Sequence, residues 1–268
     1  MGRRARLDAE LVRRGLARSR DDAQALVASG RVMVAGAPAL KASSQVDPGS
    51  PLVVTGEQDG DRYVSRGAHK LAGALDAFAA DGLTVEGRRC LDAGASTGGF
   101  TDVLLRRGAA QVVAVDVGYG QMAWPLTQDD RVVVVDRVNA RELTTAMVGG
   151  PVDVVVADLS FISLRLVLPA LLGCLRPDGD ALPMVKPQFE VGRDKVGARG
   201  VVRDPELRAG AVGAVVDAAA AVGWGARGVV ASPLPGPSGN VEYFVWLRSG
   251  SPTVDQQAVR RAVEEGPQ

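Results

Sequence analysis

Five apolar runs constrain the fold of this chain more than any other feature. They are RRCLDAG, QVVAVDV, RVVVVD, VDVVVADLS and ALPMVK, and helical segments separate them, notably at 101–107, 164–175 and 205–222. Continuous apolar strands are typical of a parallel sheet covered by helices on both faces. Two further strands, ARGVVASP and VEYFVWLR, flank the turn-rich LPGPSGN. We therefore predict a doubly wound, mostly parallel α/β sheet whose terminal strand runs antiparallel.

The N-terminal part has a net positive charge, although the net charge of the whole chain is zero. The 268 residues hold 31 Lys and Arg against 31 Asp and Glu. Residues 1–46 hold nine basic and four acidic residues, a difference of +5, so the remainder carries −5. This part has no Phe, Trp or Tyr, so it lacks the stacking platform of single-strand binders. If this part binds nucleic acid, we expect it to contact phosphates and to recognise the shape of a duplex. The alternative is that its basic residues form an ordinary solvent-exposed surface.

The same part predicts a small α+β domain. We expect helices over 7–14 and 20–29, with Ser19 as N-cap of the second, and short strands at RVMVAG and 52–54. Residues 47–62 are rich in Gly, Pro and acidic residues and lead into a linker. The predicted domains are 1–61 and 62–268.

Several classes of protein are disfavoured. The two cysteines form no CxxC, which argues against a disulfide scaffold and a zinc site, and we expect no metal. The charged N-terminus lacks the apolar stretch of a signal peptide. No apolar run reaches the ~18–20 residues that span a bilayer. We expect a cytoplasmic protein.

A glycine loop, CLDAGASTGGF at 90–100, joins a predicted strand to a predicted helix and so suggests a nucleotide site. A dinucleotide loop places a second glycine where this chain has Ser96, which disfavours a nicotinamide cofactor without excluding it. Asp116 ends the next strand, 22 residues beyond Gly94, where a carboxylate accepts ribose hydroxyls of either cofactor.

The pattern D-x-G-x-S-x-G-G resembles the loop of S-adenosylmethionine methyltransferases. That resemblance implies S-adenosylmethionine as cofactor, with the adenine contacted after the third strand by Asp136 or Asn139. The candidate cofactor residues are Asp92, Gly94, Ala95, Ser96, Thr97, Gly98, Gly99, Phe100, Asp116, Asp136 and Asn139.

Four charged residues are expected at the carboxyl edge of the sheet, where open α/β sheets bind ligands. Asp158 and Lys186 end two strands, Glu242 opens the terminal strand, and Lys70 begins the first large helix. Ribose 2′-hydroxyl methylation needs a base, and a lysine can serve where burial or a nearby cation favours its neutral form. Taken singly, each charge is more often a solvated strand end.

The order Lys, Asp, Lys, Glu resembles the tetrad of FtsJ-like ribose methyltransferases. The segments SRGAHKL, DVGYGQ, ADLSFISL, VKPQFE and LPGPSGNVEYF match as well, and nearly the whole chain resembles the hemolysin-named TlyA family. This implies a Rossmann-like domain that methylates cytidine ribose in small- and large-subunit rRNA within ribosomal subunits. In our hypothesis Lys186 is the base, Asp158 orients it, Lys70 promotes its deprotonation, and Glu242 holds Lys70 or the ribose.

The segment over about 5–50 resembles an RNA-binding motif shared by a ribosomal protein and many RNA-modifying enzymes. This resemblance implies phosphate contacts from Arg6, Arg18, Arg20 and Lys41. In the larger domain Arg66 and Arg137 are candidates for an extended basic surface. Phe161 is a candidate for stacking on an extruded base, with core packing as the equal alternative.

Three rival functions stay open: a membrane-active protein, suggested by the hemolysin name, an inactive RNA-binding module, and a nicotinamide enzyme. Nothing implies a protein partner, and a monomer is the simplest assumption.

Overall fold

The computed structural model describes residues 4–17, 19–54, 63–192, 195–197 and 200–267. The chain forms two compact units, Met1–Arg62 and Tyr63–Gln268. Arg18 and the predicted boundary between residues 61 and 62 lie outside the described residues. No described helix combines the length and the hydropathy that crossing a membrane requires.

The smaller unit packs short helices against short strands. Its described elements are β1 (Ala5–Arg6), α1 (Leu7–Arg13), α2 (Arg20–Ala28), β2 (Val32–Val34), β3 (Ala37–Pro38), β4 (Gln45–Val46) and β5 (Leu52–Val54). Strand β1 pairs with β4, and the other sheet has the order β3-β2-β5, all antiparallel. Ser19 caps α2 as predicted, because its hydroxyl accepts a hydrogen bond from the Asp22 N–H at 3.1 Å. Leu7, Leu11 and Leu26 centre a core that holds the unit together.

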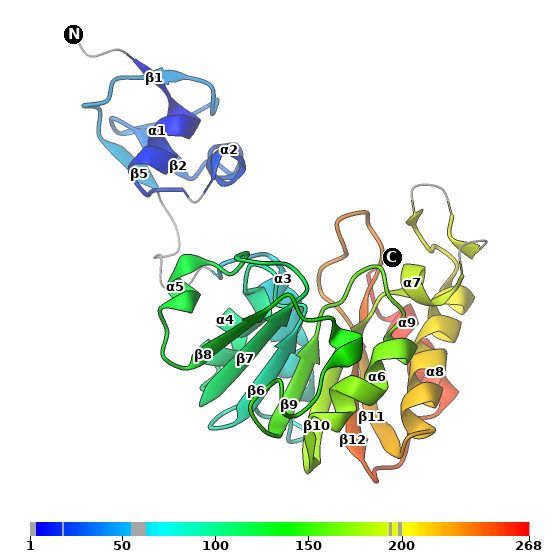
Figure 1. Ribbon diagram of the computed structural model, residues 1–268. Helices are drawn as coiled ribbons and strands as arrows, with labels where there is room; N and C mark the ends of the chain where they lie inside the picture. Colours follow the sequence, from blue (N-terminus) through cyan, green and yellow to red (C-terminus); the bar gives the residue numbers. More distant parts are fainter. Residues whose placement is uncertain (1–3, 18, 55–62, 193–194, 198–199, 268) are drawn as a thin grey trace. The chain divides into compact units, whose positions relative to one another are not determined.

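The larger unit contains a sheet with the strand order β11-β12-β10-β9-β6-β7-β8 (Figure 1). The strands are β6 (Arg89–Ala93), β7 (Gln111–Asp116), β8 (Val132–Asp136), β9 (Val152–Ala157), β10 (Leu175–Val185), β11 (Trp224–Ala231) and β12 (Tyr243–Ser249). The pairs from β10 to β8 are parallel, and β12 is antiparallel to both neighbours. The predicted doubly wound sheet and its antiparallel terminal strand are confirmed.

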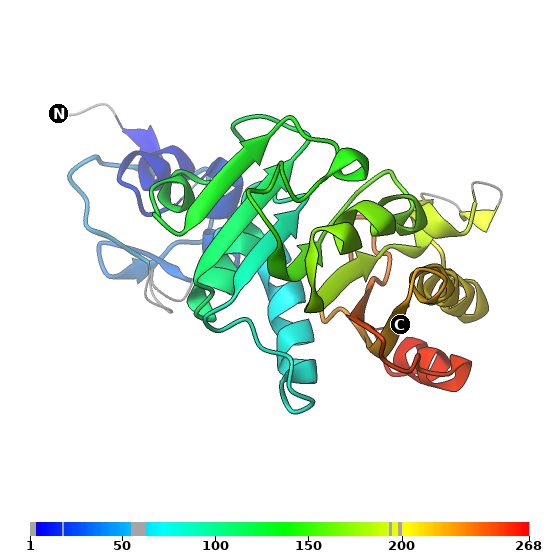
Figure 2. The same ribbon diagram turned by 60° about the horizontal axis from the view of Figure 1, so that its bottom comes forward.

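Helices cover both faces of this sheet, as the two views of the ribbon show (Figures 1 and 2). The helical elements are α3 (Gly67–Ala79), α4 (Gly99–Arg106), α5 (Trp124–Thr127), the 3-10 turn η2 (Ala140–Glu142), α6 (Leu164–Gly173), α7 (Pro187–Glu190), α8 (Pro205–Ala220) and α9 (Gln256–Glu264). Side chains alternate along the strands, so Cys90 and Val112 join one core with α3 and α4. Leu91 and Val113 join the other, with α6, α8 and α9.

The parallel strands all end at one edge, and the loops that follow them bend sharply. Outside glycine, a positive φ is found at Ser96 (+48°), Arg137 (+62°) and Phe161 (+64°), in the loops after β6, β8 and β9. The other described case, Ala35 (+49°), lies in a hairpin of the smaller unit. Left-handed backbone is unfavourable for such residues, and it often concentrates at functional sites. The carboxyl edge of the sheet is therefore the place to look for chemistry.

Candidate active site

The glycines of the loop after β6 are required by packing against other parts of the protein. Gly94 has a φ of +84°, and a Cβ there would collide with the backbone carbonyl oxygen of Asp158, at the end of β9. Gly98 has a φ of +94°, and a Cβ there would meet Met122 and Leu126. The loop can therefore pass close to its neighbours only because these side chains are absent.

Asp92 lies beneath this loop and is fully buried. Its Oδ2 accepts a hydrogen bond from the Thr101 hydroxyl at 2.7 Å, while its Oδ1 has no hydrogen-bond partner among the described residues. Burial raises the pKa of Asp92 to about 7, although the Thr101 hydrogen bond opposes the shift. Phe100, also in the predicted set, is buried in the core with its ring 5.9 Å from that of Phe244.

Asp116 connects the glycine loop to the turn that follows β7. Its Oδ2 accepts from the Ser96 N–H at 2.8 Å and its Oδ1 from the Gly118 N–H at 2.7 Å. Asp136, at the end of β8, accepts from the Gly120 N–H at 2.9 Å. The two strand-end carboxylates thus hold the 116–121 turn in place. Each Asp116 oxygen keeps a further lone pair for another donor.

A cavity of about 520 Å³ opens beside these groups. Its wall is formed by the loops after β6, β7, β8 and β9: Gly94, Ser96, Val115, Asp116, Val117, Gln121, Val138, Asn139, Ala140, Asp158, Leu159, Ser160, Phe161 and Ile162. The predicted cofactor residues that line it are Gly94, Ser96, Asp116 and Asn139. The predicted residues that do not line it are Asp92, Ala95, Thr97, Gly98, Gly99, Phe100 and Asp136. The structure therefore brings the middle of the glycine loop, not its ends, to the cavity.

Lys186 and Asp158 meet where β10 and β9 end. The Lys186 Nζ lies 2.7 Å from the Asp158 Oδ1 and donates a hydrogen bond to the Ser160 hydroxyl at 2.9 Å. The Lys186 side chain is 11% exposed and the Asp158 side chain 26%, so solvent reaches this pair. Lys186 precedes Pro187 at the start of α7, and this ends the strand at the lysine.

Lys70 and Glu242 form a second, more deeply buried pair. The Lys70 Nζ lies 2.5 Å from the Glu242 Oε2, with side-chain exposures of 7% and 1%. Lys70 belongs to the first turn of α3, and Glu242 immediately precedes β12. A Cβ on Gly236 would lie 2.6 Å from the other Glu242 oxygen, so the 233–240 loop closes over the carboxylate. The four predicted charges therefore form two ion pairs.

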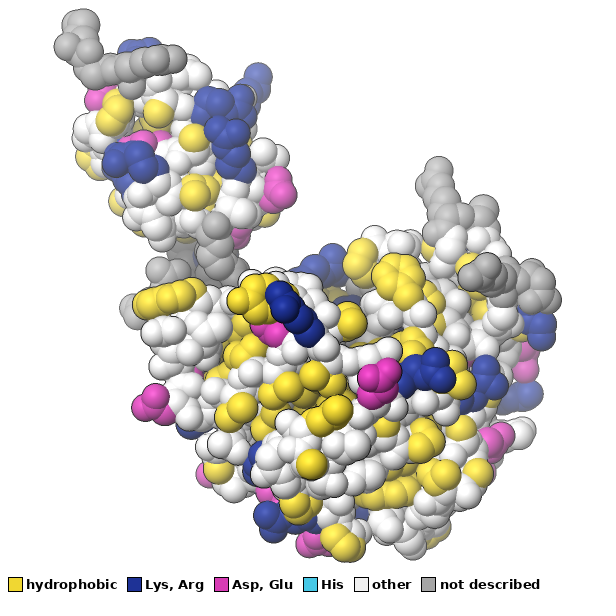
Figure 3. Space-filling view, in the orientation of Figure 1, with side chains coloured by type: hydrophobic (Ala, Val, Ile, Leu, Met, Phe, Trp, Pro, Cys, Tyr) yellow, Lys and Arg dark blue, Asp and Glu magenta, His cyan; other side chains and the backbone are white. Residues whose placement is uncertain are grey.

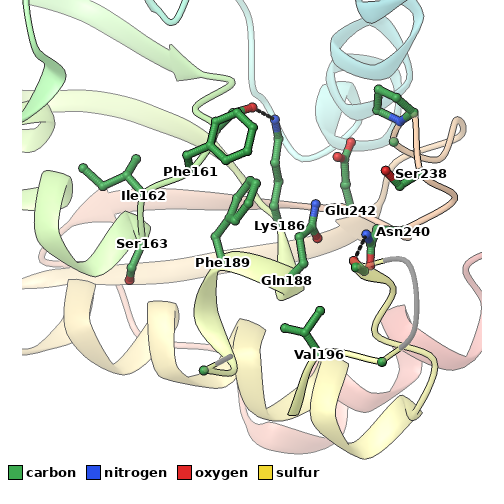
Figure 4. Close-up of a pocket in the computed structure, with 16 residues that line it drawn as sticks. Phe161, Ile162, Ser163, Lys186, Gln188, Phe189, Val196, Ser238, Asn240 and Glu242 are labelled. Carbon is green, nitrogen blue, oxygen red and sulfur yellow. Dashed lines mark hydrogen bonds between the residues drawn. The ribbon is translucent and has the colours of Figure 1, made fainter. Parts of the chain in front are cut away.

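A larger cavity of about 850 Å³ contains Lys186 and Glu242 in its wall (Figure 4). Phe161 and Phe189 stand at its side, with ring centroids 5.4 Å apart, and Phe161 is 91% exposed. Of the two roles left open for Phe161, core packing is therefore wrong. Ser160, Phe161 and Ile162 line this cavity and the smaller one alike. The two cavities thus share a wall next to the Lys186–Asp158 pair.

The residues predicted to contact RNA differ in their surroundings. Arg6 is partly exposed and holds the buried Asp8 through two hydrogen bonds, of 2.6 and 3.0 Å. Arg20 and Lys41 are exposed and form no salt bridge within the described part of the chain. Basic side chains stand out on the face of the smaller unit in Figure 3.

In the larger unit, both predicted arginines contact neighbouring loops. Arg66 donates to the Pro235 carbonyl oxygen at 3.0 Å, which ties α3 to the 233–240 loop. Arg137 is exposed and lies over the Tyr119 ring, 4.3 Å from its centroid. Their positive charges remain open to solvent on one side.

Sequence reasoning missed several cavity residues: Ser160, Gln188, Phe189, Ser238 and Asn240. Ser160 and Gln188 each lie two residues beyond a predicted charge, Asp158 and Lys186. The rule that ligands bind beyond the carboxyl ends of strands applies to them equally. Applying that rule to the residues after Asp158 and Lys186 would have identified Ser160 and Gln188 from the sequence.

Comparison with known proteins agrees with this geometry. Residues 63–249 match the FtsJ-like methyltransferase family, and residues 5–52 match the S4 domain. The chain is 60% identical over 273 residues to the 16S/23S rRNA (cytidine-2′-O)-methyltransferase TlyA of Mycobacterium tuberculosis, covering all of both chains. It is 35% identical to Hemolysin A of Brachyspira hyodysenteriae, covering 89% of this chain and 98% of that protein.

Solved structures of two hemolysin-named proteins are also similar to this chain. A putative hemolysin from Streptococcus thermophilus superposes with a TM-score of 0.75 at 38% identity, covering 98% of this chain and 95% of that one. A putative hemolysin from Lactococcus lactis gives a TM-score of 0.72 at 41% identity, covering 76% and 98%. The chain belongs to the TlyA family, in which an S4 domain precedes an FtsJ-like methyltransferase domain.

Proposed function

We propose that this protein transfers a methyl group from S-adenosylmethionine to the 2′-hydroxyl of cytidine in rRNA of the small and large ribosomal subunits. The observation that carries the proposal is the placement of the Lys186–Asp158 ion pair beside the wall shared by two cavities, with Glu242 of the second pair in the wall of the larger one. The 60% identical relative is a 16S/23S rRNA (cytidine-2′-O)-methyltransferase, which supports the same reaction and the same nucleoside.

The smaller cavity suits the cofactor. Asp116 offers free lone pairs to ribose hydroxyls, and Val117, Val138 and Leu159 provide apolar surface for a base. We assign its binding to Gly94, Ser96, Asp116 and Asn139, with Asp92 and Asp136 supporting the loops that carry them. When bound, S-adenosylmethionine supplies a methyl group on a positively charged sulfur.

Lys186 is the base in this proposal. Its amine takes the proton of the ribose hydroxyl as the oxygen–carbon bond forms, while the methyl group would leave its sulfur, which keeps the electron pair and becomes neutral. The resulting ammonium faces the Asp158 carboxylate 2.7 Å away. Ser160 holds the lysine toward the wall between the cavities. Positioning accounts for much of the rate, since methyl transfer needs the acceptor in line with the methyl group.

Lys70 and Glu242 have a supporting role. Their pair is almost wholly buried, and the Glu242 carboxylate neutralises the charge of Lys70. The second oxygen of Glu242 faces the 233–240 loop. The pair connects α3 to the wall of the larger cavity, which Glu242 and Lys186 both line.

RNA binding is assigned to both units. Arg6, Arg18, Arg20 and Lys41 of the S4 domain contact phosphates, and Arg66 and Arg137 are candidate phosphate contacts on the larger unit. Phe161 stacks on the base of the target nucleotide, because an exposed ring on strained backbone at the cavity mouth has no partner other than Phe189 among the described aromatic side chains. We further propose that the protein acts as a monomer in the cytoplasm, where ribosomal subunits are found.

One observation favours a second candidate, membrane activity: the name Hemolysin A of a relative. Leakage of liposomes by endotoxin-free protein is its test. An inactive rRNA-binding module is the other alternative, and it would bind RNA without methylating it.

Methyl transfer tests the proposal directly. Purified protein is mixed with methyl-labelled S-adenosylmethionine and unmodified ribosomal subunits, with naked rRNA and unrelated RNA as controls. The RNA is then hydrolysed in alkali. A labelled dinucleotide that resists alkali is expected, because the methyl group blocks the hydroxyl that cleavage needs. Label on a base would contradict the assigned chemistry, and RNA binding without label would favour the inactive module.

A further inference from the structure

One amide in the wall of the larger cavity has an oxygen that no described residue contacts through a hydrogen bond. Gln188 lies two residues after Lys186 in the first turn of α7, and its Oε1 is buried with no hydrogen-bond partner among the described residues. Figure 4 shows its side chain extending from α7 toward the part of the cavity where Lys186 and Glu242 end. A buried acceptor without a donor costs free energy, so a donor from a bound molecule would stabilise it.

The neighbouring amide is not available for a ligand. The Asn240 Oδ1 accepts from the Val202 N–H at 2.9 Å, and the Asn240 Nδ2 donates to the Gly200 carbonyl oxygen at 2.8 Å. Asn240 therefore uses its side chain to link the loop before β12 to the backbone at Gly200 and Val202. Gln188 is the side-chain amide of this wall whose oxygen is left for recognition.

Helix α7 holds Gln188 in place. Glu190, at the end of α7, is buried, and its carboxylate accepts from the Leu164 N–H at 2.7 Å and the Ser163 hydroxyl at 2.6 Å. It thus satisfies N–H and hydroxyl groups at the start of α6, where Ser163 itself forms no side-chain cap. Pro187 restricts the first turn. A side chain on such an anchored turn is preorganised for recognition.

The chemistry of the proposed reaction identifies the missing donor. The base of a nucleotide is attached to the carbon next to the one that bears the 2′-hydroxyl. If that hydroxyl lies at Lys186, the base must lie in the same cavity, beside Phe161 and Phe189. Cytosine carries an exocyclic amino group next to its N3 acceptor, whereas uracil carries a carbonyl oxygen there. An amide whose oxygen faces the exocyclic group and whose NH2 faces N3 matches cytosine, whereas pairing with uracil would need the opposite amide orientation.

We propose that Gln188 reads the Watson–Crick edge of the target base, its Oε1 accepting a hydrogen bond from the cytosine amino group, and thereby selects cytidine over uridine. The inference rests on the proposed function. It assigns to Gln188 a role in specificity that is separate from the roles of the four charged residues in methyl transfer.

The test measures how strongly the enzyme prefers cytidine to uridine at the target position, in addition to its activity. After the methylated position is mapped with wild-type protein, subunits are reconstituted from transcripts that carry C or U there. Wild-type protein should show a kcat/KM for C at least about 10-fold above that for U. Gln188→Leu should bring the two values within about threefold of each other, because the lost pairing favours cytosine alone. Gln188→Met, which keeps the side-chain length, is measured in parallel.

Controls separate the possible failures. Gln257→Leu, on the exposed side of α9, should keep the wild-type ratio. Thermal stabilisation by S-adenosylmethionine should be the same in all variants, which shows that they fold and load the cofactor. A wild-type ratio near one, or an unchanged ratio in Gln188→Leu and Gln188→Met, would overturn the inference. Absence of methylation of either subunit by wild-type protein would instead overturn the proposed function.

Discussion

Lys70 and Glu242 are 172 residues apart in the chain, yet their charged atoms lie 2.5 Å apart in an almost fully buried pair. The contact joins the first helix of the larger unit to the start of its last strand. Removing water from two charges is costly, so the pair is stable only while both members are present.

Lys70→Met should destabilise the protein by about 3–5 kcal/mol, since it leaves Glu242 buried without a cation. Glu242→Leu should have a similar cost, and the double variant should lose much less than the sum. Denaturant unfolding of the four proteins measures this coupling. Additive losses would show that the two side chains do not act as a pair.

Lys186→Met should lower the rate of methyl transfer about 10²–10⁴-fold, the usual contribution of a general base. Lys186→Arg is the matched control. It keeps a cation opposite Asp158 but cannot give up its proton near neutral pH, so it should be as inactive as Lys186→Met. Recovery of activity in Lys186→Arg would mean that the lysine acts only through its charge. Cofactor binding should be unaffected in both.

Asp92 makes the stability of the ligand-free protein depend on pH. Its pKa is raised to about 7 by burial, so its contribution is complete below the unfolded pKa near 4 and is lost as pH rises through 7. Asp92→Asn removes this titration and should be the more stable protein at pH 8, by about 4 kcal/mol for a shift of about three pKa units. Denaturant unfolding at pH 4.5, 6 and 8 checks the sign. Parallel curves for both proteins would contradict it.

Gly94→Ala should destabilise the protein and weaken cofactor binding, because the new methyl group must displace the Asp158 carbonyl. Gly223 is a matched control, since it has the same φ of +84° but nothing within 4 Å of an added Cβ. Gly223→Ala should cost only about 1–2 kcal/mol from its left-handed backbone and leave cofactor binding unchanged. Equal effects of the two substitutions, measured by thermal unfolding with and without S-adenosylmethionine, would refute the argument from the Asp158 contact.

Arg20→Ala and Lys41→Ala should each weaken binding to ribosomal subunits and reduce the slope of log affinity against log salt by about 1. Both side chains are exposed and form no salt bridge with described residues, so folding should not suffer. Arg260→Ala, which removes an exposed arginine paired with Glu206 on the larger unit, is the control and should leave the slope unchanged. An unchanged slope for Arg20→Ala and Lys41→Ala would show that they do not contact phosphate.

The pattern of apolar runs was enough to predict the sheet, because strands buried on both faces leave a signal that needs no knowledge of their neighbours. Helix α9 was missed, although Asp255 caps it and Val259, Ala262 and Val263 have helical spacing. Its surface is polar elsewhere, so the apolar stripe is narrow and easily overlooked. The signal was present but short.

The site was harder to predict than the sheet. Asp158, Lys186 and Glu242 are placed at one edge by the ends of their strands, but the pairing of Lys70 with Glu242 depends on how closely α3 approaches the start of β12. The sequence also did not show why glycine is needed at positions 94 and 98. A Cβ at these positions would collide with Asp158, Met122 or Leu126, which are distant in sequence. Gln188 acquires its place from Glu190 and α6, a tertiary contact that no local pattern encodes.

The wall formed by Ser160, Phe161 and Ile162 has two faces, one toward each cavity. If a ligand in one cavity shifts these three residues, it also changes the wall of the other cavity. The two binding equilibria are then thermodynamically linked, and whatever one ligand adds to the affinity of the second, the second returns to the first. Under the proposed assignment of the cavities, the affinity for S-adenosylmethionine would then depend on whether RNA is bound.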